Sequence, residues 1–171
     1  MNKYKFLLLF VLCCVLPLAA AKLVLEMGWF NSGVSSKGQW QQGEVHVLPA
    51  STEKAHWRLA VVPGTAACNA SCQQALFTVH QLYLGLGRKQ QHVQPVLLGS
   101  QTLPEQFAEF KHYAAEQAVP ANLQQQILLV DYQGMVLLSY PMPASEEQMA
   151  PTAKAIRQDL LKLLNYDRTS V

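Results

Sequence analysis

Two cysteines, Cys68 and Cys72, lie four residues apart at the point where a short apolar run ends and a helical pattern begins. The apolar run at 57–62 predicts a buried strand, and the proline and glycine that follow it predict a turn. A helix that opens on cysteine brings both sulfur atoms to its N-terminus, where unpaired N–H groups and the helix dipole stabilise a thiolate. We therefore interpret this strand, turn and helix as the centre of the fold and of its chemistry.

The spacing of the pair decides what it can do. If the helix begins at or just before Cys68, both cysteines lie on one face, and their Cα separation fits a disulfide. The pair can then form a disulfide, react as a dithiol, or hold a soft metal ion such as Cu(I). The other two cysteines, Cys13 and Cys14, lie in an apolar N-terminal run and are expected to face lipid or pack against a helix.

The N-terminal segment predicts a membrane anchor. Residues 1–5 are basic, and residues 6–25 form an apolar run of 20 residues whose one charge, Lys22, lies near its end. At about 1.5 Å per residue this run spans a hydrocarbon core. We predict a single transmembrane helix, with the N-terminus in the cytoplasm and the C-terminal domain exported. The alanines at 19–21 are also typical of a cleavage site, so a cleaved signal peptide remains an alternative to the anchor. In both cases the domain reaches a compartment where disulfides persist.

The composition limits the classes of function. The chain of 171 residues is 50% hydrophobic and 14% charged, with a net charge of +2. It therefore has room for one ordinary domain beside the anchor, and it lacks the basic charge that nucleic-acid binding requires. The sequence also lacks a phosphate loop, a nucleotide fingerprint, a nucleophile elbow and an H-E-x-x-H helix. Nucleic-acid binding is excluded, and the cysteine pair remains as the one strong chemical signal.

After the anchor, residues 26–54 read as a juxtamembrane linker with a short strand near 45–48, and residues 55–171 as one domain. Within that domain the patterns predict strands at 57–62, 93–98, 127–130 and 135–140, and helices that open at Cys68, at 102–105 and at Pro151. The order β-α-β-α-β-β-α, with right-handed crossovers, is the thioredoxin-like arrangement. We predict an α/β, thioredoxin-like exported domain behind one N-terminal transmembrane helix.

Two details of these helices are testable. The helix that opens at 102–105 is expected to bury Phe107, Phe110 and Ala114, because their spacing places them on one face. The acidic residues of the last helix, Asp159 among them, are expected to be solvated.

A strand that leads into C-x-x-x-C, followed by a β-α unit and a D-x-x-G hairpin at 131–134, resembles the SCO/SenC family of membrane-anchored, thioredoxin-like copper proteins. W-R-L-A-V-V-P-G at 57–64, C-N-A-S-C at 68–72 and L-G-L-G-R at 84–88 are similar to a bacterial group of small inner-membrane proteins that accompany cytochrome c oxidase genes. The resemblance implies a role in oxidase biogenesis, with an oxidase subunit or another assembly factor as partner. It implies that Cys68 and Cys72 bind copper together with a distant histidine, or reduce the thiols of the oxidase copper site.

The sequence departs from the family at the third ligand. In the family the histidine lies in the loop before the D-x-x-G hairpin, and the corresponding loop here, 119–126, has none. The residue after the second cysteine, typically proline in the family, is Gln73. His80 lies about 12 Å from Cys72 along the helix axis, too far to share an ion with it. The third metal ligand is therefore not identified.

The other histidines give no better candidate. His56 and His92 precede the N-terminal ends of strands, which places them at the edge of the sheet opposite to the cysteines. His112 is expected to be exposed on the helix at 102–114. His46 lies in a segment that the patterns do not place.

Three hypotheses remain open for Cys68 and Cys72. The first is an assembly factor that handles Cu(I), the one cofactor we expect, through two thiolates. The second is a thiol–disulfide oxidoreductase, in which one cysteine attacks and the other resolves. The third is a non-catalytic scaffold whose Cys68–Cys72 disulfide is structural, although so short a loop makes a weak constraint on the unfolded chain.

Overall fold

The computed structural model describes residues 3–27, 36–52, 57–64, 68–99, 103, 105–114 and 119–166. The chain divides into two compact units, Met1–Ser35 and Ser36–Val171.

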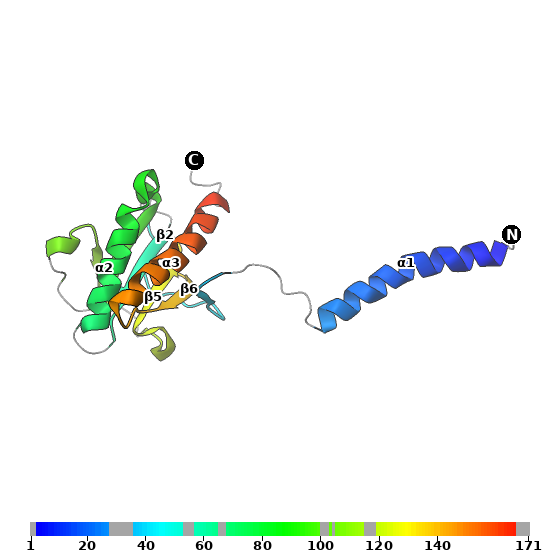
Figure 1. Ribbon diagram of the computed structural model, residues 1–171, viewed down its shortest axis with the longest axis horizontal. Helices are drawn as coiled ribbons and strands as arrows, with labels where there is room; N and C mark the ends of the chain where they lie inside the picture. The colour runs from blue at the N-terminus through cyan, green and yellow to red at the C-terminus, as the bar shows by residue number, and fades with distance from the viewer. Residues whose placement is uncertain are drawn as a thin grey trace. The chain divides into compact units, whose positions relative to one another are not determined.

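The first unit contains the helix α1 (Lys3–Glu26) (Figure 1). Its segment Leu7–Val24 is apolar and contains no buried residue, and among the described residues it is the one helix that is long and apolar enough to cross a membrane. Cys13 and Cys14 are both exposed on it. An exposed apolar surface of this extent calls for an apolar environment, in keeping with the predicted anchor.

The second unit is built on one mixed sheet of six strands in the order β1-β6-β5-β2-β3-β4. The strands are β1 (Gln39–Trp40), β2 (Trp57–Val62), β3 (Val93–Leu98), β4 (Lys111–Tyr113), β5 (Gln126–Val130) and β6 (Val136–Pro141). β2 pairs in parallel with β3, and β3 with β4, whereas β5 runs antiparallel to both β2 and β6. β2 is apolar at five of its six positions and lies in the interior of the sheet, where every one of its residues is buried.

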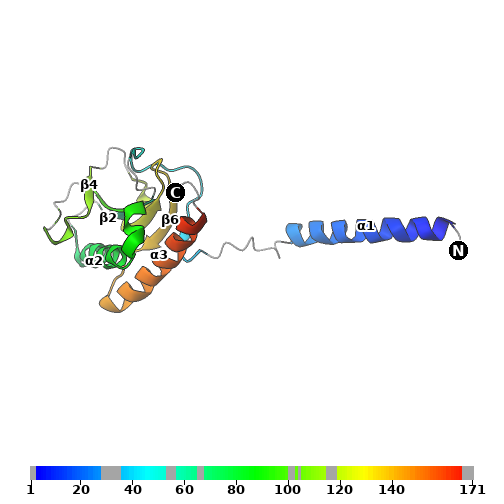
Figure 2. The same cartoon turned by 90° about the horizontal axis from the view of Figure 1, so that it is seen from above.

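Two long helices, α2 (Ala70–Leu84) and α3 (Glu146–Tyr166), cover one face of this sheet (Figures 1 and 2). They bury Leu76, Val79, Ile156 and Leu160 against strand side chains of that face. The opposite face is covered by Leu48 and Leu123, which come from irregular segments and short turns. Three 3-10 turns, η1 (Gly87–His92), η2 (Glu105–Phe107) and η3 (Ala121–Leu123), connect the elements.

The prediction of a helix that opens at 102–105 was wrong for the residues that the structure describes there. Residues 105–107 form η2, and Lys111–Tyr113 form the edge strand β4, which pairs with Val96–Leu98. Phe107 and Phe110 are buried as expected, but Ala114 is exposed. The available edge of β3 offers hydrogen bonds that outweigh a weak local helix preference, so tertiary pairing decides the conformation.

The last helix also begins earlier than its proline indicated. α3 starts at Glu146, five residues before Pro151, which therefore lies inside it. The proline cannot bond to the carbonyl of Glu147, but Glu147 is exposed in the first turn, where water replaces the missing donor. The β5–β6 hairpin at Asp131–Gly134, by contrast, is confirmed by its antiparallel register.

Asp159 of α3 was expected to be solvated, and this was wrong because the residue is 2% exposed. Its Oδ2 atom accepts hydrogen bonds from the backbone N–H groups of Lys37 at 2.6 Å and Gly38 at 2.9 Å, and from the Tyr140 hydroxyl at 2.9 Å. A Cβ on Gly38 would lie 2.6 Å from the Tyr140 ring, so glycine is needed there. This cluster fastens the start of the second unit to α3 and β6.

The same cluster predicts a pH dependence. Burial, and then the charge and hydrogen bond of Asp159, raise the pKa of Tyr140 well above its ordinary value of 10.0. Because the folded state holds this proton more tightly than the unfolded state, the stabilisation is complete below about pH 10 and is lost as the pH rises further. We expect the free energy of unfolding in urea to fall between about pH 10 and pH 11.5, and to fall less steeply in Tyr140→Phe. Equal slopes in the two proteins would contradict this assignment.

Candidate functional site

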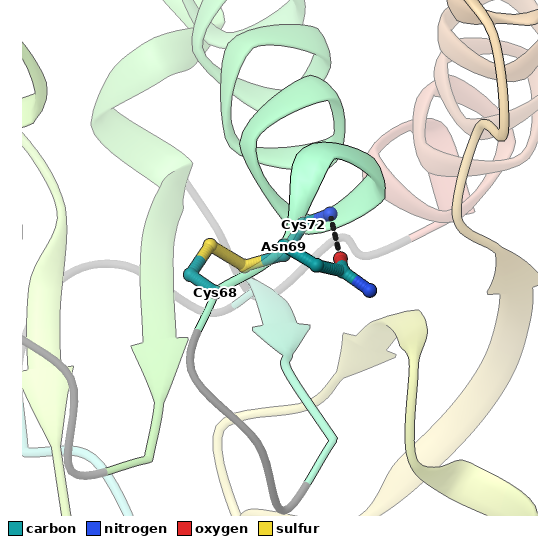
Figure 3. Close-up of a disulfide and its surroundings, with 3 residues drawn as sticks. All are labelled: Cys68, Asn69 and Cys72. Atoms are coloured by element: carbon teal, nitrogen blue, oxygen red, sulfur yellow. Dashed lines mark hydrogen bonds between the residues drawn. A yellow bond between two sulfur atoms is a disulfide. The ribbon is translucent and has the colours of Figure 1, made fainter.

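The structure joins Cys68 and Cys72 in a disulfide, with their Cα atoms 5.2 Å apart (Figure 3). α2 begins at Ala70 and not at Cys68, so the first cysteine precedes the helix and the second lies in its first turn. The reason is Asn69, which has extended backbone angles and accepts a hydrogen bond from the Cys72 N–H at 3.0 Å. Asparagine is among the best residues at this capping position.

The two sulfur atoms differ in their surroundings. Cys72 is 2% exposed and belongs to the core under the helices, whereas Cys68 is half-buried and reaches the surface. A nucleophile from solvent would therefore reach Cys68 more readily than Cys72, and Cys72 Sγ would then be the leaving group. Cys72 lies in the first turn of α2, where the helix dipole stabilises the thiolate that the opened bond would release.

The capping bond of Asn69 predicts a modest loss of stability on substitution. We expect Asn69→Ala to lower the free energy of unfolding by about 1 kcal/mol, because the Cys72 N–H loses its acceptor. Asn69→Asp keeps a side-chain acceptor and serves as the control, with an expected change near zero. Urea denaturation of the oxidised proteins measures both, and an unchanged stability in Asn69→Ala would show that the cap is dispensable.

The register of the sheet gathers several chain segments around the disulfide. The last residue of β2, Val62, pairs with Gln126 at the start of β5, and Gln126 pairs with Pro141 at the end of β6. The N-termini of α2 and α3 therefore lie at the same edge of the sheet. Within the described residues Gln125 is the one non-glycine with positive φ, at 56°. Its side chain crosses Gly64, where a Cβ would lie 3.1 Å from the Gln125 amide nitrogen.

Gln125 thus stands in the loop before the hairpin, which is where the family resemblance places a histidine. Sequence reasoning noted that the histidine was missing, but it did not single out Gln125. A left-handed backbone conformation at a residue other than glycine costs free energy and is typical of functional or tightly packed positions. No residue pattern signals such a conformation.

A surface groove of about 860 Å³ begins at Cys68. Side chains from α2, η2 and the first turns of α3 line it, among them Gln74, Phe77, Gln106, Glu146 and Met149. Among the lining residues that the structure describes, Glu146 is the one that carries a charge. The sequence did not predict this groove. A helix was wrongly expected at 102–114, and with that helix there was no reason to place η2 beside α2.

The histidines lie as follows. His92 precedes β3, whose first residue pairs with the first residue of β2, and His46 bridges to Met135 beside the hairpin turn, so both lie at the edge opposite to the cysteines. His80 packs edge-on against Phe107 and contacts Glu109 at 3.3 Å. His112 is exposed on β4 and bonds to the carbonyl of Gly99. His56 lies outside the described residues, and within them no three His, Cys, Asp or Glu side chains form a group that could hold a metal ion.

Comparison with known proteins identifies the fold. A family model described as transmembrane-like, thioredoxin-like, C-terminal domain matches residues 57–167. The chain belongs to this family. The predicted thioredoxin-like class of the domain is confirmed, and so is its combination with a long apolar helix near the N-terminus.

Two solved structures are similar to part of this chain. The solution structure of the apo Sco1 protein from Thermus Thermophilus has 15% identity and a TM-score of 0.48, and the match covers 77% of this chain and 99% of that one. A SCO1/SenC family lipoprotein from Bacillus anthracis str. Ames has 12% identity and a TM-score of 0.39, with 68% and 95% covered. No curated protein matches the sequence.

Proposed function

We propose that this protein is a membrane-anchored assembly factor for cytochrome c oxidase that handles Cu(I), or the redox state of thiols, through Cys68 and Cys72. One observation carries the proposal: the pair lies at a helix N-terminus, with Cys68 partly exposed and Cys72 buried. The family resemblance of the sequence supplies the oxidase as partner. The apolar helix α1 supports a location in the bacterial inner membrane, with the domain in the periplasm.

In the copper reading, the reduced pair loses two protons and offers two thiolates, the ligands that Cu(I) prefers. The described histidines offer no third ligand from this chain. A site with two thiolates leaves Cu(I) open to a further ligand, so a ligand from the oxidase can bind the ion before the cysteines release it. Low coordination then favours transfer over storage.

The unequal exposure of the two sulfurs favours a second function, thiol–disulfide exchange. A partner thiolate attacks Cys68 Sγ, and Cys72 Sγ leaves with the electron pair of the broken bond. The reduction potential of the pair separates this function from a structural bridge. A potential above about −300 mV indicates a working dithiol, and a lower one indicates a structural disulfide and a scaffold role.

The function is tested in cells of the source bacterium that lack this protein. They are complemented with the wild-type chain, with the double variant Cys68→Ser, Cys72→Ser, or with the matched control Cys13→Ser, Cys14→Ser. We expect cytochrome c oxidase activity, and the copper content of the membranes per haem, to be restored by the wild type and the control but not by the first variant. Full restoration by Cys68→Ser, Cys72→Ser would refute the proposal and support a scaffold.

A further inference from the structure

We propose that the groove at Cys68 is the docking site for an extended, cysteine-bearing segment of a partner protein, with apolar and basic residues beside its cysteine. This inference rests on the proposed function, because it requires the Cys68–Cys72 bond to take part in exchange. It goes further in naming the surface and the residues that select the partner.

The position of the groove indicates what must enter it. Cys68, the more exposed cysteine of the pair, lies in its lining, so an occupant that carries a thiol brings that thiol close to the disulfide. A volume of about 860 Å³ far exceeds the space that one cysteine side chain fills, and it accommodates several residues. A peptide segment is thus a better fit than a small thiol.

The apolar part of the lining supplies an anchor. Phe77 projects from the outer face of α2 and is 47% exposed, although it is a large aromatic residue. Met149 of α3 also lines the groove, and its flexible thioether adapts to differently shaped side chains. An apolar side chain that lies between them removes exposed aromatic surface from water, as residues at the centre of protein interfaces do.

The polar part of the lining suits a main chain and a positive charge. Gln74 and Gln106 line the groove with amides that both donate and accept hydrogen bonds, as a peptide backbone requires. The Gln74 Oε1 atom is buried without a hydrogen-bond partner, and a small rotation toward an incoming N–H would relieve that cost. Glu146 is the one charged residue in the described part of the lining, so a lysine or arginine is favoured over an acidic residue.

The chemical step is a balanced exchange. The partner cysteine loses its proton to solvent, and its thiolate attacks Cys68 Sγ. A new bond forms between the partner sulfur and Cys68 Sγ, while the Cys68–Cys72 bond breaks and Cys72 Sγ leaves as a thiolate. The partner sulfur is oxidised and Cys72 Sγ is reduced, so no other oxidant is required.

The test compares a peptide with a small thiol. The full-length chain in detergent, oxidised and carrying Cys13→Ser and Cys14→Ser, is mixed with N-acetylcysteine or with a blocked ten-residue peptide whose single cysteine is flanked by leucines and lysines. A matched peptide has glutamates in place of the lysines. Mass spectrometry after acid quenching gives the rate constant for the mixed disulfide. We expect the lysine peptide to react at least about tenfold faster than N-acetylcysteine.

Variants then assign the effect to the groove. Phe77→Ser is expected to lower the ratio of the peptide rate to the N-acetylcysteine rate by about tenfold, and Glu146→Gln to abolish the preference for the lysine peptide. Leu84→Ser is the control, because Leu84 lies on the same helix, outside the groove lining, with the same 47% exposure.

The outcomes separate the two proposals. An unchanged ratio in Phe77→Ser, or an equal fall in Leu84→Ser, would overturn the docking site while leaving the reactive disulfide intact. If neither N-acetylcysteine nor the peptide opens the disulfide, exchange chemistry fails, and the docking proposal fails with it.

Discussion

Gly134→Ala is expected to destabilise the thioredoxin-like domain by at least about 3 kcal/mol. Gly134 has a φ of +93°, and a Cβ there would overlap the backbone carbonyl oxygen of Leu48. Since both atoms belong to fixed backbone, no side-chain rotation relieves the clash. Urea denaturation of wild type and variant measures the loss.

The clash is costly because the chain can relieve it only by separating two segments that are hydrogen-bonded to each other. The Val47 N–H donates to the Gly134 carbonyl at 3.0 Å, and the Val136 N–H donates to the Val45 carbonyl at 2.9 Å. Leu48, 6% exposed, is part of the core that these segments cover. Moving the segment away from the hairpin therefore breaks hydrogen bonds and uncovers apolar surface.

Gly43→Ala is the matched control. Gly43 has a nearly equal φ of +87°, but no described atom beyond its own chain neighbours lies within 4 Å of the position of its Cβ. The control therefore carries only the conformational cost of a left-handed alanine, about 1 to 2 kcal/mol. Equal losses in the two variants would show that the contact with Leu48 does not govern the hairpin.

Asp159→Ala is expected to lower the free energy of unfolding by about 3 to 5 kcal/mol. The substitution removes the acceptor of three hydrogen bonds and leaves the Tyr140 hydroxyl and the Gly38 N–H buried without partners. The loss is partly offset because the Oδ1 atom of Asp159 is itself buried without a hydrogen bond, with Lys162 Nζ 3.7 Å away.

Asp159→Asn tests which property of the side chain is required. The amide keeps an oxygen where Oδ2 accepts its three bonds, so this variant is expected to lose less than half as much stability. Hydrogen exchange localises the effect: the amide protons of Lys37 and Gly38 should exchange faster in Asp159→Ala and remain protected in Asp159→Asn. Unchanged protection of both amides in Asp159→Ala would contradict the assigned role.

Local sequence patterns predicted the elements that are stabilised by their own sequence neighbours or that lie in the interior of the sheet. The apolar run at β2, bounded by a proline and glycine, and the spacing of Leu76 and Val79 in α2 both agree with the structure. The hairpin was predicted from its D-x-x-G pattern. The pattern is informative because Asp131 stabilises its own turn by accepting hydrogen bonds from the N–H groups of Gln133 and Met135. In each case sequence neighbours decide the conformation.

Elements that depend on distant segments could not be predicted in this way. The stretch 105–114 becomes a turn and strand because the edge of β3 is available, a fact that no local spacing contains. Asp159 is buried because Lys37 and Gly38, more than 100 residues away, supply donors. One signal was present: Asp159 is three residues after Ile156 and four before Leu163, on the apolar stripe of α3.

The candidate site shows the same division. The spacing of Cys68 and Cys72 predicted a pair that can form a disulfide, because a separation of four residues at a helix start keeps the two side chains close. The groove and the left-handed Gln125 arise from segments that meet at the edge of the sheet only after folding. Their positions follow from topology and not from any motif.

Copper handling by the cysteine pair, the first of the two proposed functions, is tested by anaerobic Cu(I) titration of the reduced full-length chain in detergent against a competing chelator. Cys13 and Cys14 are first replaced by serine, so that Cys68 and Cys72 are the remaining thiols. We expect one tightly bound Cu(I) per chain, and we expect it to be lost when Cys68 and Cys72 are also replaced by serine. Binding that is equally tight without these two cysteines, or no binding above the chelator background in their presence, would contradict it.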